Sequence, residues 1–169
     1  MKSAVSLFCF VLFVLQHSIA SADPFPTLCE GTWQGTMNIW SHGRLMDSVK
    51  IQLTILPMMD ERGSYSWKTE YFSETHPMVK DYIIYQKEGS IHEYIIDEGE
   101  GVLLTNYVYG YKMYNLFKVG KTWLTSSYEF LEDKLIFEVT SGQKSKLKSK
   151  GVDNYTFEFL QRAVLTRIN

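Results

Sequence analysis

Cysteine and proline are scarce in this sequence: its 169 residues include two Cys and four Pro. Cys9 lies within the first 22 residues, so a chain that loses this segment keeps Cys29 alone and forms no intramolecular disulfide bond. The prolines leave residues 78–169 free to pair as continuous hairpins, because they occur only at ends and breaks, at Pro24, Pro26, Pro57 and Pro77. A disulfide scaffold is excluded, and the hydrophobic core must hold the fold.

A large excess of charge of either sign is also missing. The formal net charge is −2, whereas a protein that binds the phosphate backbone of nucleic acids needs a concentrated basic face. This balance argues against a nucleic-acid partner. After the first 22 residues, no apolar run approaches the roughly 20 residues of a membrane-spanning helix. With 45% hydrophobic and 15% aromatic residues, the composition indicates one compact domain.

The first 22 residues follow the order of a secretory signal. Lys2 precedes an apolar run from Ala4 to Leu15, and the small residues Ala20, Ser21 and Ala22 follow it. We therefore expect residues 1–22 to be a cleaved signal peptide. We expect residues 23–169 to form a single domain that is secreted or periplasmic, with no integral membrane segment.

Polar and apolar residues alternate over 48–55 and again over 134–140. A period of two places one face of each segment in a core. Gly, Asp and Asn residues interrupt such segments at hairpin-sized intervals. The pattern predicts an all-β fold, a single antiparallel up-and-down β-barrel of about eight to ten strands. The predicted strands lie near 32–40, 48–56, 64–72, 79–86, 91–96, 102–109, 111–119, 122–130, 134–140 and 155–166.

Two short motifs point to a known architecture. The first predicted strand opens with the triplet G-T-W at 31–33, and residues 81–85 read D-Y-I-I-Y. These motifs resemble the calycin superfamily, the β-barrels that include lipocalins, fatty-acid-binding proteins and avidins. The resemblance implies that Trp33 closes one end of the barrel beneath the guanidinium of Arg162 in the last strand, with Arg167 as the alternative.

Catalytic and metal-binding motifs are missing from the chain. No G-x-S-x-G motif is present, and Glu30 beside Cys29 opposes a reactive thiolate. The histidines at 42, 76 and 92 lack metal-ligand spacing. Nitrobindin-like haem barrels, a branch of the calycins, use a histidine near the C-terminus as the iron ligand, and no His follows His92 here. We therefore expect a protein that is not an enzyme, with no catalytic residues, metal or cofactor.

The predicted inner faces carry an aromatic series with a few polar groups. Such side chains either fill a barrel or line a cavity for a small apolar or amphiphilic molecule. The candidate ligand-binding residues are Met37, Trp67, Tyr71, Asn115, Phe117, Phe137, Phe157 and Phe159.

Lysines at every second position mark a segment that we expect to be a loop. Lys144, Lys146, Lys148 and Lys150 would share one side if the segment were extended, and could contact a protein or an anionic surface.

The leading hypothesis is a barrel that binds its ligand without chemistry. The alternative is a filled barrel that acts as an interaction module through this segment, and a weaker third interpretation is a barrel isomerase or lyase with a lone interior acid.

Overall fold

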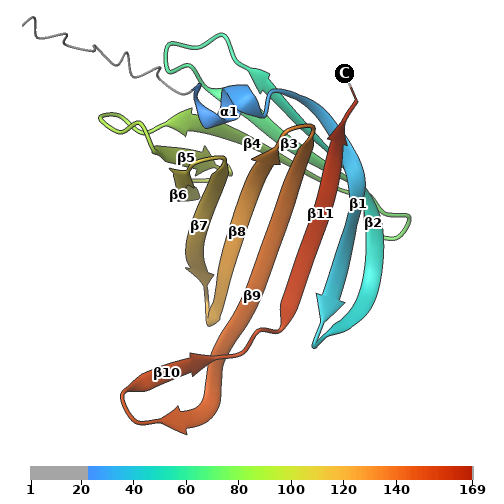
Figure 1. The fold of residues 1–169 in the computed structure, drawn as a ribbon, viewed down its shortest axis with the longest axis vertical. Helices are drawn as coiled ribbons and strands as arrows, with labels where there is room; N and C mark the ends of the chain where they lie inside the picture. The colour runs from blue at the N-terminus through green and yellow to red at the C-terminus, as the bar shows by residue number, and fades with distance from the viewer. Residues whose placement is uncertain (1–22, 169) are drawn as a thin grey trace, which may run out of the picture.

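The computed structural model describes residues 23–168 and forms one antiparallel β-sheet that closes into a barrel (Figure 1). The expected signal peptide lies outside the described residues. The elements are α1 (Phe25–Leu28), β1 (Gly31–Ser41), β2 (Arg44–Pro57), β3 (Tyr65–Phe72), β4 (Met78–Gln86), β5 (Glu93–Asp97), β6 (Leu103–Tyr109), β7 (Lys112–Val119), β8 (Thr122–Leu131), β9 (Lys134–Ser149), β10 (Val152–Tyr155) and β11 (Phe159–Arg167). Among the described residues, no helix has the length and apolar character needed to cross a bilayer.

Ten strands form the wall of the barrel, and β10 lies outside it. Strands β1 to β8 pair in chain order, β8 pairs with β9, and β11 lies between β9 and β1. The first and last strands are therefore neighbours, with Trp33 opposite Arg167 and Met37 opposite Ala163. The expected antiparallel barrel is confirmed.

The alternating pattern sets which side chains form the core. In β2, Val49, Ile51, Leu53 and Ile55 face inward and are buried. They belong to one core with inward residues of other strands, which include Met37, Trp67, Leu135 and Leu165. Helix α1 lies across one end of the barrel (Figure 1), where Phe25 and Cys29 join the same core.

Two strands extend further than the sequence indicates. Strand β2 begins at Arg44 because the turn at His42 and Gly43, with φ of 49° and 77°, reverses the chain within two residues. The expected loop at Lys144–Lys150 is instead a hairpin, since β9 continues to Ser149 and pairs with β10.

The chain returns from this hairpin close to Gly142. A Cβ atom there would lie 1.8 Å from the carbonyl oxygen of Thr156, so only glycine permits the approach. The last strand therefore starts at Phe159 and not near residue 155.

Candidate functional site

Trp33 seals the barrel at the end near α1. Its side chain is fully buried, and its indole Nε1 donates a hydrogen bond to the carbonyl oxygen of Cys29 at 2.8 Å. The guanidinium carbon of Arg167 lies 4.5 Å from the ring centroid, a cation–π contact. Arg167 also donates to the carbonyl oxygen of Leu28 at 3.2 Å. The last strand thus holds α1 against the first strand.

Arg162 does not cover Trp33, which corrects the expectation from the motif. Its Nε lies 3.5 Å from Glu138 Oε2. The inward positions of β11 are those of buried Ala163 and Leu165, so alternation places Arg162 on the outer face and Arg167 on the inner one.

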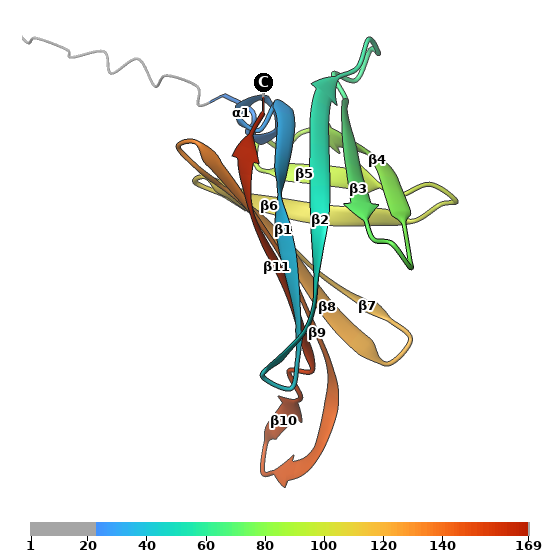
Figure 2. The ribbon, with the colours of Figure 1, turned by 90° about the vertical axis from the view of Figure 1, so that its right-hand side faces the viewer.

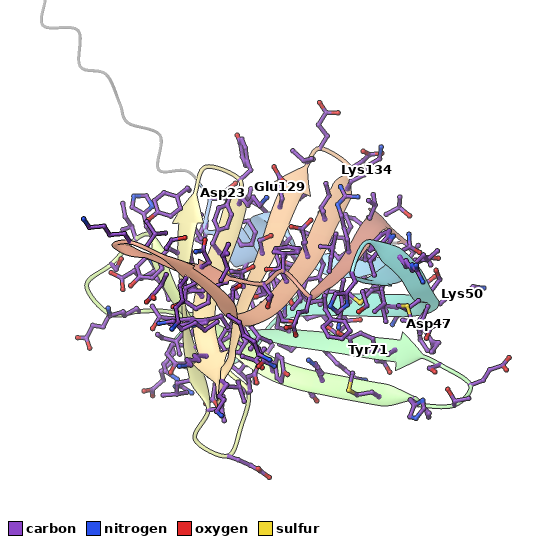
Figure 3. The ribbon with its side chains drawn as sticks, turned by 90° about the horizontal axis from the view of Figure 1, so that it is seen from below. Asp23, Asp47, Lys50, Tyr71, Glu129 and Lys134 are labelled. Atoms are coloured by element: carbon purple, nitrogen blue, oxygen red, sulfur yellow. The ribbon has the colours of Figure 1, made fainter. Side chains whose placement is uncertain are left out.

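Burial of the inward side chains falls along the barrel axis. In β2 the exposed fractions are 0%, 0%, 1% and 8% at Ile55, Leu53, Ile51 and Val49. The next inward residue, Asp47, is exposed. The barrel is therefore filled near α1 and opens at the opposite end. Figure 3 views the molecule from below, with Asp47 and Tyr71 labelled.

An aromatic layer lies directly beneath the seal. Phe130 meets Trp33 edge-to-face at a centroid distance of 6.2 Å, and Tyr128 is the next inward residue of β8. Tyr128 stacks on Phe137 at 4.5 Å and meets the edge of Trp67 at 5.0 Å. This layer is the floor of the open part of the barrel.

The indole of Trp67 has an unsatisfied donor. The side chain is fully buried, and among residues 23–168 its Nε1 makes no well-formed hydrogen bond and only a weak interaction with the nearby Tyr128 hydroxyl. Leaving such a donor unpaired costs about 1–3 kcal/mol. An acceptor atom on a bound molecule would recover part of this cost.

Three tyrosines and a glutamate lie close together at the edge of the aromatic layer. Burial raises the pKa of Tyr71 to about 12. Burial also raises the pKa of Tyr82 and of Tyr128, and the negative charge of Glu98 raises both further because it disfavours a second anion nearby. The phenol hydroxyls therefore stay protonated at neutral pH. They are hydrogen-bond donors beside a carboxylate in a largely apolar interior.

A slot opens in the barrel wall between β6 and β7. These strands pair over three positions only, from Tyr107 opposite Tyr114 to Tyr109 opposite Lys112. Beyond them the strands diverge (Figure 2), and a cavity of about 670 Å³ lies between them. Most of its lining side chains are exposed outward positions, among them Tyr107, Tyr114 and Leu116, whereas Leu104, Asn115 and Phe117 belong to the inner face. The hollow therefore lies mainly on the outer side of the wall.

Five of the eight predicted ligand residues lie at these places. Trp67 and Phe137 belong to the aromatic layer, and Tyr71 belongs to the tyrosine cluster. Asn115 and Phe117 line the slot. The Oδ1 atom of Asn115 accepts hydrogen bonds from the backbone N and the hydroxyl of Ser126 at 3.0 and 2.9 Å. These bonds hold the Asn115 side chain in place beside the cavity.

The other three predicted residues lie elsewhere. Met37 is fully buried and packs in the core. Phe159 is 43% exposed at the start of β11, at the open rim. Phe157 is 66% exposed and lies in no strand, because the chain leaves the barrel wall for the β9–β10 hairpin and returns only at Phe159. The prediction of Phe157 as an interior residue is wrong.

Sequence reasoning missed Tyr82, Glu98 and Tyr128. Tyr82 alternates with buried Ile84, and Glu98 continues the inward series of Tyr94 and Ile96. Alternation could have placed all three inside, but nothing in the sequence shows that they meet.

No metal site is apparent among residues 23–168, where no group of three or more His, Cys, Asp and Glu side chains comes together. Cys29 is fully buried, and burial raises the pKa of its thiol well above the usual range. The thiolate that nucleophilic chemistry needs is thus strongly disfavoured.

No protein-family model matches the chain, and no curated protein matches it in sequence. Solved structures share its fold. The S-type phycobiliprotein lyase CPES of Guillardia theta superposes with a TM-score of 0.62 at 8% identity, over 86% of this chain and 91% of that one. A protein of unknown function from the DUF3598 family of Nostoc punctiforme superposes with a TM-score of 0.58 at 14% identity, over 85% of this chain and 49% of that one. Rv2717c of M. tuberculosis superposes with a TM-score of 0.50 at 13% identity, over 88% of this chain and 99% of that one.

These similarities support a calycin-like barrel. They also correct one expectation. The prediction that the protein is not an enzyme is contradicted by CPES, a lyase that shares the fold over most of this chain, although the identity between them is only 8%.

Proposed function

We propose that the barrel binds one small amphiphilic molecule with a flat, conjugated body and at least one hydrogen-bond acceptor. The observation that carries the proposal is the unpaired Nε1 of Trp67 at the floor of the open half, next to the tyrosine cluster. A barrel that served only as a packed core would gain stability by replacing such a donor with an apolar group.

The lining of the open half favours this class of molecule. Aromatic rings such as Tyr128 and Phe137 stack well on flat conjugated systems. The phenols supply donors, and Glu98 supplies an acceptor. The likeness to a phycobiliprotein lyase further supports a bilin-like molecule. Binding is a step that carriers and lyases have in common.

The test is a titration of the purified protein with biliverdin, followed by its visible absorbance. The expected result is saturable binding. Replacing Trp67 by Phe keeps an aromatic ring but removes the donor, so the W67F variant should bind about 3- to 10-fold more weakly, the value of one neutral hydrogen bond.

Trp123→Phe is the matched control, because the side chain of Trp123 lies on the outer face of β8 and this variant should bind like the original protein. In the original protein, biliverdin should quench mainly the emission of Trp67, with little change from Trp123. Absence of saturable binding by the folded protein would contradict the proposal. Equal losses in the two variants would remove Trp67 from the site.

We further propose that the protein works outside the cytoplasm, on the strength of the signal-like order of residues 1–22. N-terminal sequencing of material exported by its host should begin at or within two residues of Asp23. A mature protein that still begins at Met1 would contradict this.

A further inference from the structure

The β9–β10 hairpin projects beyond the open end of the barrel (Figures 1 and 2). We call residues 144–155 the basic hairpin. Lys144, Lys146 and Lys148 alternate along β9, and Lys150 lies in its turn. Asp153 is the one carboxylate in the basic hairpin, and its Oδ1 lies 2.7 Å from Lys144 Nζ. Three of the four lysines therefore have no ion-pair partner among the described residues.

The end of β7 and the turn that follows it add two lysines beside the basic hairpin. Lys118, Lys121 and Lys144 line a hollow of about 410 Å³ together with Trp123 and Tyr155. The Lys118 ammonium lies 5.4 Å from the centroid of the Trp123 ring, and Tyr155 meets that ring edge-to-face at 6.1 Å. This end of a chain with net charge −2 is thus basic.

Apolar side chains are exposed on the same projection. Leu147 is 69% exposed, Val152 is 61% exposed, and both flank the turn of the basic hairpin. Phe157, directly after it, is 66% exposed. Lysines alone could serve to keep the free edge of β10 from pairing with another strand. Large apolar residues at the tip work against that purpose, because they promote association.

Aromatic and aliphatic side chains next to unpaired lysines match the chemistry of a bilayer surface. Trp and Tyr favour the membrane–water interface, and each Lys near an anionic surface adds to the attraction. A hairpin that enters tip-first would place Leu147 and Val152 among the acyl chains and the ammonium groups at the phosphates. A folded acidic protein would satisfy the lysines but offers no general partner for the exposed tip.

We infer that the basic hairpin docks the protein on membranes that contain anionic lipids, with the open end of the barrel facing the bilayer. This goes beyond ligand binding in the interior and does not depend on it.

The test is co-sedimentation of the protein with vesicles of phosphatidylcholine alone and with 30% phosphatidylglycerol. Binding to the anionic vesicles is expected, with a loss at high salt because the charges are screened. The double variant K146E/K148E should bind at least tenfold more weakly. K50E/K134E is the matched control, since it makes the same change in net charge at exposed lysines on the barrel wall (Figure 3) and should bind nearly as well as the original.

A second variant, L147S/V152S, separates a bilayer from an acidic polypeptide. It should lose binding to vesicles and keep any binding to soluble poly-glutamate. Failure to bind anionic vesicles, equal losses in the hairpin and barrel-wall variants, or vesicle binding that is insensitive to L147S/V152S would each overturn the inference. Circular dichroism of every variant checks that the barrel is intact.

Discussion

The two ends of the barrel use the same strands for different purposes. Near α1, the inward side chains of Trp33, Leu53, Leu135 and Leu165 are 0% exposed, and Trp33 is covered from both sides. At the other end, inward positions such as Asp47 face solvent, and β6 and β7 separate. Close packing at one end therefore supplies the stability that lets the other end stay incompletely packed and polar.

The largest effect should separate the two ends directly. Trp33→Ala should lower the free energy of unfolding by about 3–5 kcal/mol, because it empties the centre of the seal. Leu116→Ala at the slot should change it by less than about 0.5 kcal/mol, since Leu116 is 65% exposed. Urea unfolding of both variants measures the difference. Similar losses would show that the ends contribute equally.

A substitution that adds volume tests how tightly the sealed end is packed. A Cβ on Gly35 would lie 2.4 Å from the backbone oxygen of Val164 and 2.9 Å from Leu165 Cδ2. Gly35→Ala should therefore cost about 1–3 kcal/mol in the same assay. Gln34→Ala, which changes the adjacent outward side chain, should cost little. A neutral Gly35→Ala would mean that β11 can move away from β1.

Tyr71 lies between the two ends of the barrel, and the stability that its buried phenol contributes should fall at alkaline pH. The pKa of Tyr71 is about 12 in the folded protein and about 10 in the unfolded chain, so unfolding releases its proton between these values. The stability from the buried neutral phenol is complete below pH 10 and is lost as pH rises towards 12. At pH 11 the loss should be about 1 kcal/mol, and Tyr71→Phe should reduce it.

Exposed Tyr111 provides the control for that measurement, because Tyr111→Phe removes a phenol that folding leaves in water. Unfolding curves at pH 9 and pH 11 compare the three proteins. An identical pH response in Tyr71→Phe and the original protein would place the Tyr71 hydroxyl in water.

The smallest effect concerns the arginine above Trp33. In a double-mutant cycle, Arg167→Met and Trp33→Phe should show a coupling energy of about 0.5–1 kcal/mol, the value of an exposed cation–π contact. Arg162→Met should show no coupling to Trp33, because Arg162 lies beside Glu138 on the outer face. Coupling at Arg162 with none at Arg167 would reverse the assignment.

Most of the fold could be predicted from the sequence, because strict alternation fixes both the strand and its buried face. Residues 48–55 and 134–140 are examples, and both lie inside observed strands. Alternation fails at the basic hairpin, where lysines of period two look like a solvated loop. The motif favoured Arg162 as the residue that covers Trp33, whereas alternation with buried Ala163 and Leu165 puts Arg167 on the inner face and Arg162 on the outer one.

The candidate site was only partly predictable from the sequence. Trp67, Tyr71 and Phe137 could be placed inside from their own strands. The meeting of Tyr82, Glu98 and Tyr128 depends on the curvature of the sheet, and the slot depends on how few residues β6 and β7 share. Such features are properties of the closed barrel, and no single segment encodes them.

The pairing of β1 with β11 also constrains when the molecule can fold. Arg167 contacts Leu28, a residue 139 positions earlier, and its side chain covers the first strand. A growing chain has no partner for β1 on that side until residues 159–167 have been synthesised. The seal can therefore form only after the last strand has left the ribosome, so the first strand must wait unpaired on that side while ten further strands are made.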